Sequence, residues 1–180
     1  MNNLKSKMIA FFSIITNDSG SYVGAILVTD HMGIPKEFKC TQSIKPTQVQ
    51  KSLYGSSLIP FISNELCGKV LLDNLSNKPE IIFVENDFQN ALSNFINNTV
   101  VHITKKDSEL LDKNEGNILK NKDLKYEPII ISIDNKPKES QKEILELSQK
   151  LFLNFDLMEA FDRVHEAIDL IKELDPEKYS

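Results

Sequence analysis

The first 44 residues alternate between apolar runs and short polar turns. Residues 8–16 (MIAFFSIIT) and 22–29 (YVGAILVT) are rich in β-branched and aromatic side chains, and the polar turn NDSGS separates them. In residues 36–44 (KEFKCTQSI), Phe38 and Cys40 fall on one face and charged side chains on the other, as a sheet with one buried face requires. The pattern predicts a three-stranded antiparallel meander.

The connection DHMGIP joins the second and third of these strands. Its first residue, Asp30, could be a metal ligand or a turn former, since a carboxylate at a strand end can serve as either. Gly33 supplies backbone freedom and Pro35 stops the turn from extending into a helix. We interpret Asp30 as a turn former.

The apolar period then changes from that of a strand to that of a helix. Residues 46–54 predict a short helix, Gly55-Ser56-Ser57 a break, and residues 60–73 a longer helix with Pro60 in its first turn. Two further strands are predicted at 80–86 (EIIFVEN) and 99–104 (TVVHIT), and DFQNALSNFIN between them has helical spacing behind Asp87, a predicted N-cap.

A polar excursion at 105–125 precedes a strand at 126–134 and two C-terminal helices. The last helix follows Asp156, a predicted N-cap. Its apolar stripe has alternating spacings of four and three residues: Leu157, Phe161, Val164, Ile168 and Ile171. The stripe either completes the core or packs on a partner or a second copy of the chain.

The element order predicts an α+β fold with a mixed α/β sheet, in which helices and further strands follow the meander. We expect residues 1–180 to form a single globular domain. Residues 8–104 would be its sheet core, 105–125 the excursion, and 126–180 a strand with two helices packed on that core.

Composition limits the classes of partner. The net charge is −5 and the basic residues form no block, so a stand-alone nucleic-acid binder is not expected. Only two cysteines occur, the N-terminus lacks a signal-peptide cleavage pattern, and no apolar run is long enough to cross a membrane. We therefore expect a cytoplasmic protein without a membrane partner.

Common catalytic motifs are missing, including the phosphate-binding loop, the dinucleotide-binding glycine pattern, the nucleophile elbow and the zinc motifs. Carboxylates at strand ends are the remaining candidates for chemistry, because a two-metal phosphodiesterase site needs several acidic side chains that converge. The same residues are also ordinary turn formers.

The order βββαβαβ resembles the ribonuclease H-like fold over about residues 8–104. In that family a carboxylate at the first strand, one in the first long helix and one at the end of the fourth strand bind the metals. The resemblance implies the matching residues Asp18 in NDSG, Glu65 in NELCGKVLLDNL, and Glu85 or Asp87 in IIFVEND. It also implies Mg²⁺ or Mn²⁺ as cofactor and hydrolysis of nucleic acid as activity.

The phrases PTQVQKSLYGSSLIPFI and FDLMEAFDRVHEAI also look like segments of a bacterial protein family without an established activity. In the first phrase aromatic and apolar residues cluster at the helix break, where they either cover the sheet or form a patch for a partner protein. With the last helix, this gives the candidate partner-binding residues Tyr54, Leu58, Phe61 and Phe161.

The sequence thus favours a non-catalytic interaction or scaffold subunit of a cytoplasmic bacterial assembly, which binds a protein partner or a second copy. In this hypothesis the chain is not an enzyme and has neither catalytic residues nor a cofactor. The alternative is a divergent metal-dependent nuclease of ribonuclease H-like fold, which uses Asp18, Glu65, Glu85 and Asp87.

Overall fold

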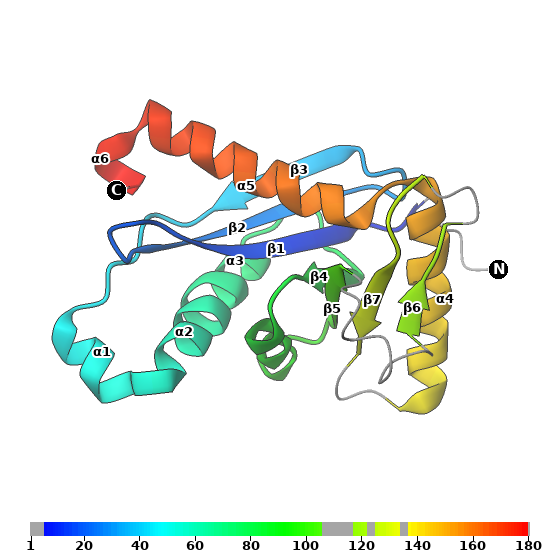
Figure 1. Cartoon of the computed structure of the whole chain (residues 1–180), viewed down its shortest axis with the longest axis horizontal. Helices are drawn as coiled ribbons and strands as arrows, with labels where there is room; N and C mark the ends of the chain where they lie inside the picture. Colours follow the sequence, from blue (N-terminus) through cyan, green and yellow to red (C-terminus); the bar gives the residue numbers. More distant parts are fainter. Residues whose placement is uncertain (1–5, 106–116, 122–124, 134–136, 180) are drawn as a thin grey trace.

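A seven-stranded mixed sheet with helices on both faces forms the protein (Figure 1). The computed structural model describes residues 6–105, 117–121, 125–133 and 137–179. The strand order is β3-β2-β1-β4-β5-β7-β6. This arrangement confirms the predicted mixed α/β fold class.

The predicted meander is confirmed. Strands β1 (Ile9–Thr16), β2 (Tyr22–Thr29) and β3 (Pro35–Cys40) pair antiparallel. The third strand is shorter than its alternation predicts. Beyond Cys40 regular pairing with β2 ends: Thr41 N–H donates to the Gly24 carbonyl, Thr41 Oγ1 accepts from Gly24 N–H at 3.0 Å, and Ile44 forms an isolated bridge with Tyr22.

Asp30 is a turn former, as interpreted from the sequence. Its Oδ1 accepts hydrogen bonds from the backbone N–H groups of Met32 (2.9 Å) and Ile34 (3.1 Å), and its Oδ2 lies 3.0 Å from Lys36 Nζ. Burial alone would raise the pKa of Asp30, but these bonds outweigh it and hold the pKa below its ordinary value. Gly33 adopts a φ of 78° within this turn.

The centre of the sheet is parallel. Strand β4 (Ile81–Val84) lies between β1 and β5 (Thr99–Lys105) and runs parallel to both. Strand β7 (Ile129–Ser132) pairs antiparallel with β5, and β6 (Ile118–Leu119) with β7. Because β4 ends at Val84 while both neighbours continue, the residue that follows β4 lies in a notch at the carboxyl edge of the sheet.

One face of the sheet is covered by a broken helical run. It comprises α1 (Gln48–Tyr54), η2 (Gly55–Ser57), α2 (Leu58–Phe61), the π-helical η3 (Ile62–Lys69) and α3 (Val70–Asp73), with the 3₁₀ segment η4 (Asp87–Asn94) beside it. The break and the second helix were expected; the π-helical geometry and the 3₁₀ form of η4 were not. The residue before η4 is Asn86, which takes the N-cap position predicted for Asp87.

The opposite face carries α4 (Lys138–Asn154), α5 (Leu157–Leu174) and the short α6 (Pro176–Tyr179). The stripe of α5 completes the core, because Phe161 is 1% exposed and its ring packs edge-on against Phe11 at 5.4 Å. Phe161 is therefore corrected from a partner-binding residue to a core residue. No described helix is long and apolar enough to cross a membrane.

The polar excursion and the strand after it differ from their predicted bounds. Within 105–125 the chain forms β6, while residues 106–116 and 122–124 lie outside the described residues. The strand expected at 126–134 extends only over Ile129–Ser132, and residue 134 lies outside the described part.

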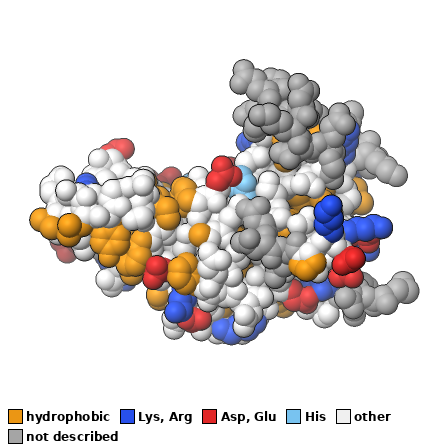
Figure 2. Space-filling view, turned by 90° about the horizontal axis from the view of Figure 1, so that it is seen from below, with side chains coloured by type: hydrophobic (Ala, Val, Ile, Leu, Met, Phe, Trp, Pro, Cys, Tyr) orange, Lys and Arg blue, Asp and Glu red, His pale blue; other side chains and the backbone are white. Residues whose placement is uncertain are grey.

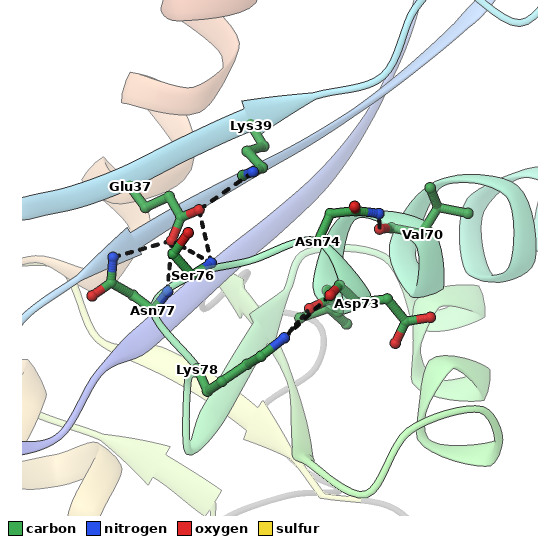
Figure 3. Close-up of polar contacts among 9 residues, drawn as sticks. Glu37, Lys39, Val70, Asp73, Asn74, Ser76, Asn77 and Lys78 are labelled. Atoms are coloured by element: carbon green, nitrogen blue, oxygen red, sulfur yellow. Dashed lines mark hydrogen bonds and ion pairs between the residues drawn. The ribbon is translucent and has the colours of Figure 1, made fainter.

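Glu37 of β3 anchors the loop between α3 and β4 (Figure 3). Its carboxylate accepts hydrogen bonds from the backbone N–H groups of Ser76 (3.0 Å) and Asn77 (2.7 Å) and from Asn77 Nδ2 (3.1 Å). These backbone bonds, aided by Lys39 Nζ at 3.6 Å, lower the pKa of Glu37 to about 2.

The E37Q variant should lose about 2 kcal/mol of unfolding free energy at pH 7, because the charged acceptor of these bonds is removed. Since the pKa of Glu37 is depressed on folding, its contribution is complete above about pH 5 and fades as the pH falls towards 2. Urea unfolding at pH 7 and pH 3 measures both effects. The exposed Glu65 provides the control E65Q, and equal losses in the two variants would contradict the prediction.

Candidate functional site

Glu85 occupies the notch after β4. Phe12 of β1 pairs with Val84, and Val84 pairs with His102 of β5, so the next position lies between Ser13 and Ile103. Side chains alternate along β4, and Phe83 faces the core beneath α5. Glu85 therefore points to the α5 side of the sheet.

His165 of α5 meets this carboxylate. Its Nε2 lies 2.7 Å from Glu85 Oε1, while both side chains keep contact with solvent, at 42% exposed for His165 and 20% for Glu85. The hydrogen bond to Glu85 raises the pKa of His165, against the opposing effect of burial; Asp162 and Asp169 add smaller attractions. The imidazole therefore carries a proton at higher pH than an isolated histidine.

Ser13 lies beside the pair on the same side of the sheet as Phe11. It is fully buried, and its Oγ has no hydrogen-bond partner among the described atoms. A buried hydroxyl in this state is uncommon and calls for an explanation. Ser13 thus adds an uncommitted polar group to the floor of the notch.

A cavity of about 360 Å³ opens on the same face of the sheet. Lys105 at the end of β5 and Asp162 of α5 both line it. Asp162 lies one helical turn before His165, so the cavity and the acid–histidine pair are neighbours on α5. A cavity next to a residue with a shifted pKa is a usual mark of a functional site.

The four carboxylates predicted as metal ligands are not brought together. Asp18 is exposed in the turn between β1 and β2, and Glu65 is exposed on η3. Within the described residues, no group of three or more His, Cys, Asp or Glu side chains is placed to hold a metal ion. The proposed set is therefore corrected: the structure keeps only Glu85 in a site.

Asp87 belongs to the opposite face. Its Oδ1 lies 3.0 Å from Nδ1 of His102, a β5 residue that is 6% exposed. Figure 2 shows one face of the molecule, where acidic side chains (red) lie next to a histidine side chain (pale blue) near the middle of the view. The sheet separates the Asp87–His102 pair from Glu85, so the two carboxylates cannot share one ion.

The residues predicted to bind a partner divide between core and surface. The rings of Tyr54 and Phe61 pack in a tilted arrangement with 4.9 Å between their centroids, and Tyr54 remains 39% exposed. Leu58 is buried in the core beneath the helical run and is corrected, like Phe161, to a packing residue. A second hollow, of about 630 Å³, lies between residues 39–44 and α3, and neither the predicted carboxylates nor these residues line it.

The pairing of Glu85 with His165 was missed by reasoning from the sequence. The sequence presents Glu85 as a candidate metal ligand or a turn former at a strand end, and His165 lies beside the apolar stripe of the last helix. Eighty positions separate them, and no spacing rule joins a strand end to the middle of the last helix. The sequence feature that could have indicated the pair is a histidine at the polar border of a helix whose other face forms the core.

Solved endonucleases share this fold over nearly the whole chain. Human endonuclease V aligns with 89% of this chain and 84% of its own, at 14% identity and a TM-score of 0.59. Endonuclease V of Ciona intestinalis, in complex with a 23mer DNA that contains an inosine, aligns with 92% and 86%, at 15% identity and a TM-score of 0.56. No family model and no curated protein matches the sequence.

These likenesses confirm the remote ribonuclease H-like resemblance at the level of the fold; the bacterial family is not supported. They also correct two predictions. The main prediction of a non-catalytic scaffold is wrong, because the solved proteins with this architecture are endonucleases. The expectation that nucleic acid is not a partner conflicts with the solved complex of such a protein with DNA.

Proposed function

We propose that the chain is a nuclease, which hydrolyses phosphodiester bonds in nucleic acid at the Glu85–His165 pair. The observation that carries the proposal is the 2.7 Å contact between these side chains, at the carboxyl edge of the central parallel strands. The endonucleases with the same architecture support nucleic acid as the substrate class.

His165 is suited to act as a general acid. Glu85 orients the ring and favours its protonated form, so the imidazolium persists to a higher pH than in a histidine without such a partner. When water attacks the phosphorus and the bond to the leaving oxygen breaks, His165 donates a proton to that oxygen. The attacking water releases a proton to solvent as its oxygen bonds to phosphorus, and a proton from solvent then restores the imidazolium. Glu85 acts here as a positioning residue.

The cofactor implied by the ribonuclease H-like resemblance is a pair of Mg²⁺ or Mn²⁺ ions, which two or more shared carboxylates hold. The donors described at the notch are one carboxylate and one imidazole, bonded to each other, and β1 contributes the neutral Ser13 beside them. This set does not fit a two-metal site, so we derive no step through a metal.

The proposal is tested with 5′-labelled single- and double-stranded DNA and RNA oligonucleotides. Each is incubated with the purified chain in Mg²⁺, in Mn²⁺ and in EDTA, and the products are resolved on a denaturing gel. We expect cleavage by the wild type, loss of cleavage in E85Q, and retention in E166Q, which changes an exposed neighbour of His165 on α5.

Two outcomes would contradict the proposal. If the wild type cleaves none of the oligonucleotides under any of these conditions, the proposed nuclease activity is refuted. Cleavage that persists in E85Q but is lost in D18N or E65Q would move the site to the carboxylates predicted from the sequence.

A further inference from the structure

The cavity near His165 has the size of a small-ligand site and lies on the same face of the sheet as the acid–histidine pair. Strand pairing places Glu85 beside Ile103, and Lys105 lies two residues further along β5 on the same face. Lys105 lines the cavity of about 360 Å³, together with Asp162 of α5. The cavity is thus placed to hold the part of a substrate next to the bond that is cleaved.

Its rim offers two positive charges. Lys105 and Lys125 both line the cavity and are exposed, and within the described residues neither ammonium forms an ion pair. Three carboxylates also line the cavity. Asp156 is the N-cap of α5, where it accepts a hydrogen bond from the backbone of Met158 at 2.9 Å, and Asp162 attracts the His165 imidazolium. Glu127 is exposed, and within the described residues it forms no ion pair with either lysine. The lining therefore carries three carboxylates and two ammonium groups, and an anion would bind at the part of the rim that Lys105 and Lys125 form.

The wall beside these lysines is aromatic and apolar. Tyr126 lines the cavity and is half-buried, with its ring 5.8 Å from that of Phe152, so packing supports it from behind. Met158, also half-buried, adds a flexible thioether. A supported aromatic ring next to phosphate-binding cations is the combination that single-stranded nucleic-acid sites use, since each base can stack while its backbone is neutralised.

We propose that this cavity binds one nucleotide of a single-stranded segment next to the cleaved bond. Lys105 and Lys125 bind its phosphate and Tyr126 stacks on its base. A volume of about 360 Å³ lies at the lower end of the range for ligand sites, which suits one nucleotide. The inference rests on the proposed nuclease function, because that function supplies the substrate.

Binding of a fluorescein-labelled 12-mer of single-stranded DNA, and of the same sequence as RNA, tests the inference by fluorescence anisotropy in EDTA. The double variant K105A/K125A should bind at least 10-fold more weakly, and the slope of log K against log salt should fall by about 1.4, or 0.7 for each lost phosphate contact. Y126A should weaken binding about 5- to 150-fold, while Y126F keeps the stacking ring and should bind like the wild type.

The matched control is K142A/K150A, which removes two exposed lysines from α4 without touching the cavity. Equal affinities of the two double lysine variants, or of Y126A and wild type, would overturn the inference. So would wild-type binding to duplex as tightly as to single strand. Thermal melting of each variant verifies that it is folded.

The two proposals fail in different ways. Cleavage with an unchanged KM in K105A/K125A would refute the nucleotide site and leave the nuclease function intact. Single-strand binding that depends on the lysines and Tyr126, but without cleavage by the wild type, would refute the nuclease function and support the site.

Discussion

Replacing His165 with glutamine should lower the rate of phosphodiester cleavage about 100- to 10,000-fold, the usual contribution of a positioned general acid. Glutamine keeps a polar side chain of similar reach but cannot supply the proton to the leaving oxygen. Single-turnover kinetics on a labelled oligonucleotide measure the change in the chemical step. Affinity for the oligonucleotide should change little, because His165 acts on the transition state.

The pH dependence separates an acid from a merely structural histidine. The hydrogen bond to Glu85 raises the pKa of His165, so the wild-type rate should stay high to a more alkaline pH than it would with an unassisted histidine. In E85Q any residual rate should fall at lower pH, since the pKa of His165 drops when its partner loses charge. An unchanged alkaline limb in E85Q would show that this imidazole is not the acid.

The second large effect is expected at Gly24 in β2, where η3 approaches the sheet. A Cβ at this position would lie 2.4 Å from Cys67 Cβ and 2.9 Å from its sulfur, so G24A cannot be accommodated without movement of the helix. Overpacking of this kind costs about 3 kcal/mol. For a chain of this length the melting temperature should fall by roughly 6–12 °C.

A double-mutant cycle identifies the cause. C67G removes the clashing Cβ and should recover part of the loss in G24A, whereas C67A keeps that Cβ and should not. Gly55 gives a matched control, because a Cβ there meets nothing within 4 Å and G55A is left only with the strain of a φ of 51°. Equal destabilisation by G24A and G55A would show that contact with Cys67 is not the cause.

Most of the fold follows from short-range pattern. The apolar runs of β1 and β2, the alternation of β3 and the stripe of α5 each indicate the element that forms, because each pattern matches the period and burial of that element. The predicted element bounds that differ from the structure depend on residues that are far away in the sequence. Residues 41–44 alternate like a strand, but their regular pairing with β2 ends at Cys40. The segment DFQNALSNFIN has helical spacing, yet its residues Asp87–Asn94 form a 3₁₀ segment against η3 and β5.

The site could not be predicted to the same extent. Turn chemistry identified Asp30 correctly because its partners lie within six residues. Glu85 directly follows β4 and keeps the face of Phe83, whereas Asp87 begins η4 and reaches the other face, and a distant histidine meets each of them. Two carboxylates that stand two positions apart in IIFVEND therefore lie on opposite faces of the sheet, because the strand has ended between them, which the sequence alone does not reveal.

The parallel pairing of β4 with β1 also has a consequence for folding kinetics. Ile9 pairs with Ile81, 72 residues away, whereas the meander closes through turns of only a few residues. Contacts of long sequence separation form slowly, since loop closure must precede the gain in contact energy. We therefore expect the meander to gain protection from hydrogen exchange first, and the notch that holds Glu85 only after β4 inserts. Formation of the Glu85–His165 contact would then mark the last stage of folding, and it would also be the step that puts the proposed general acid in place.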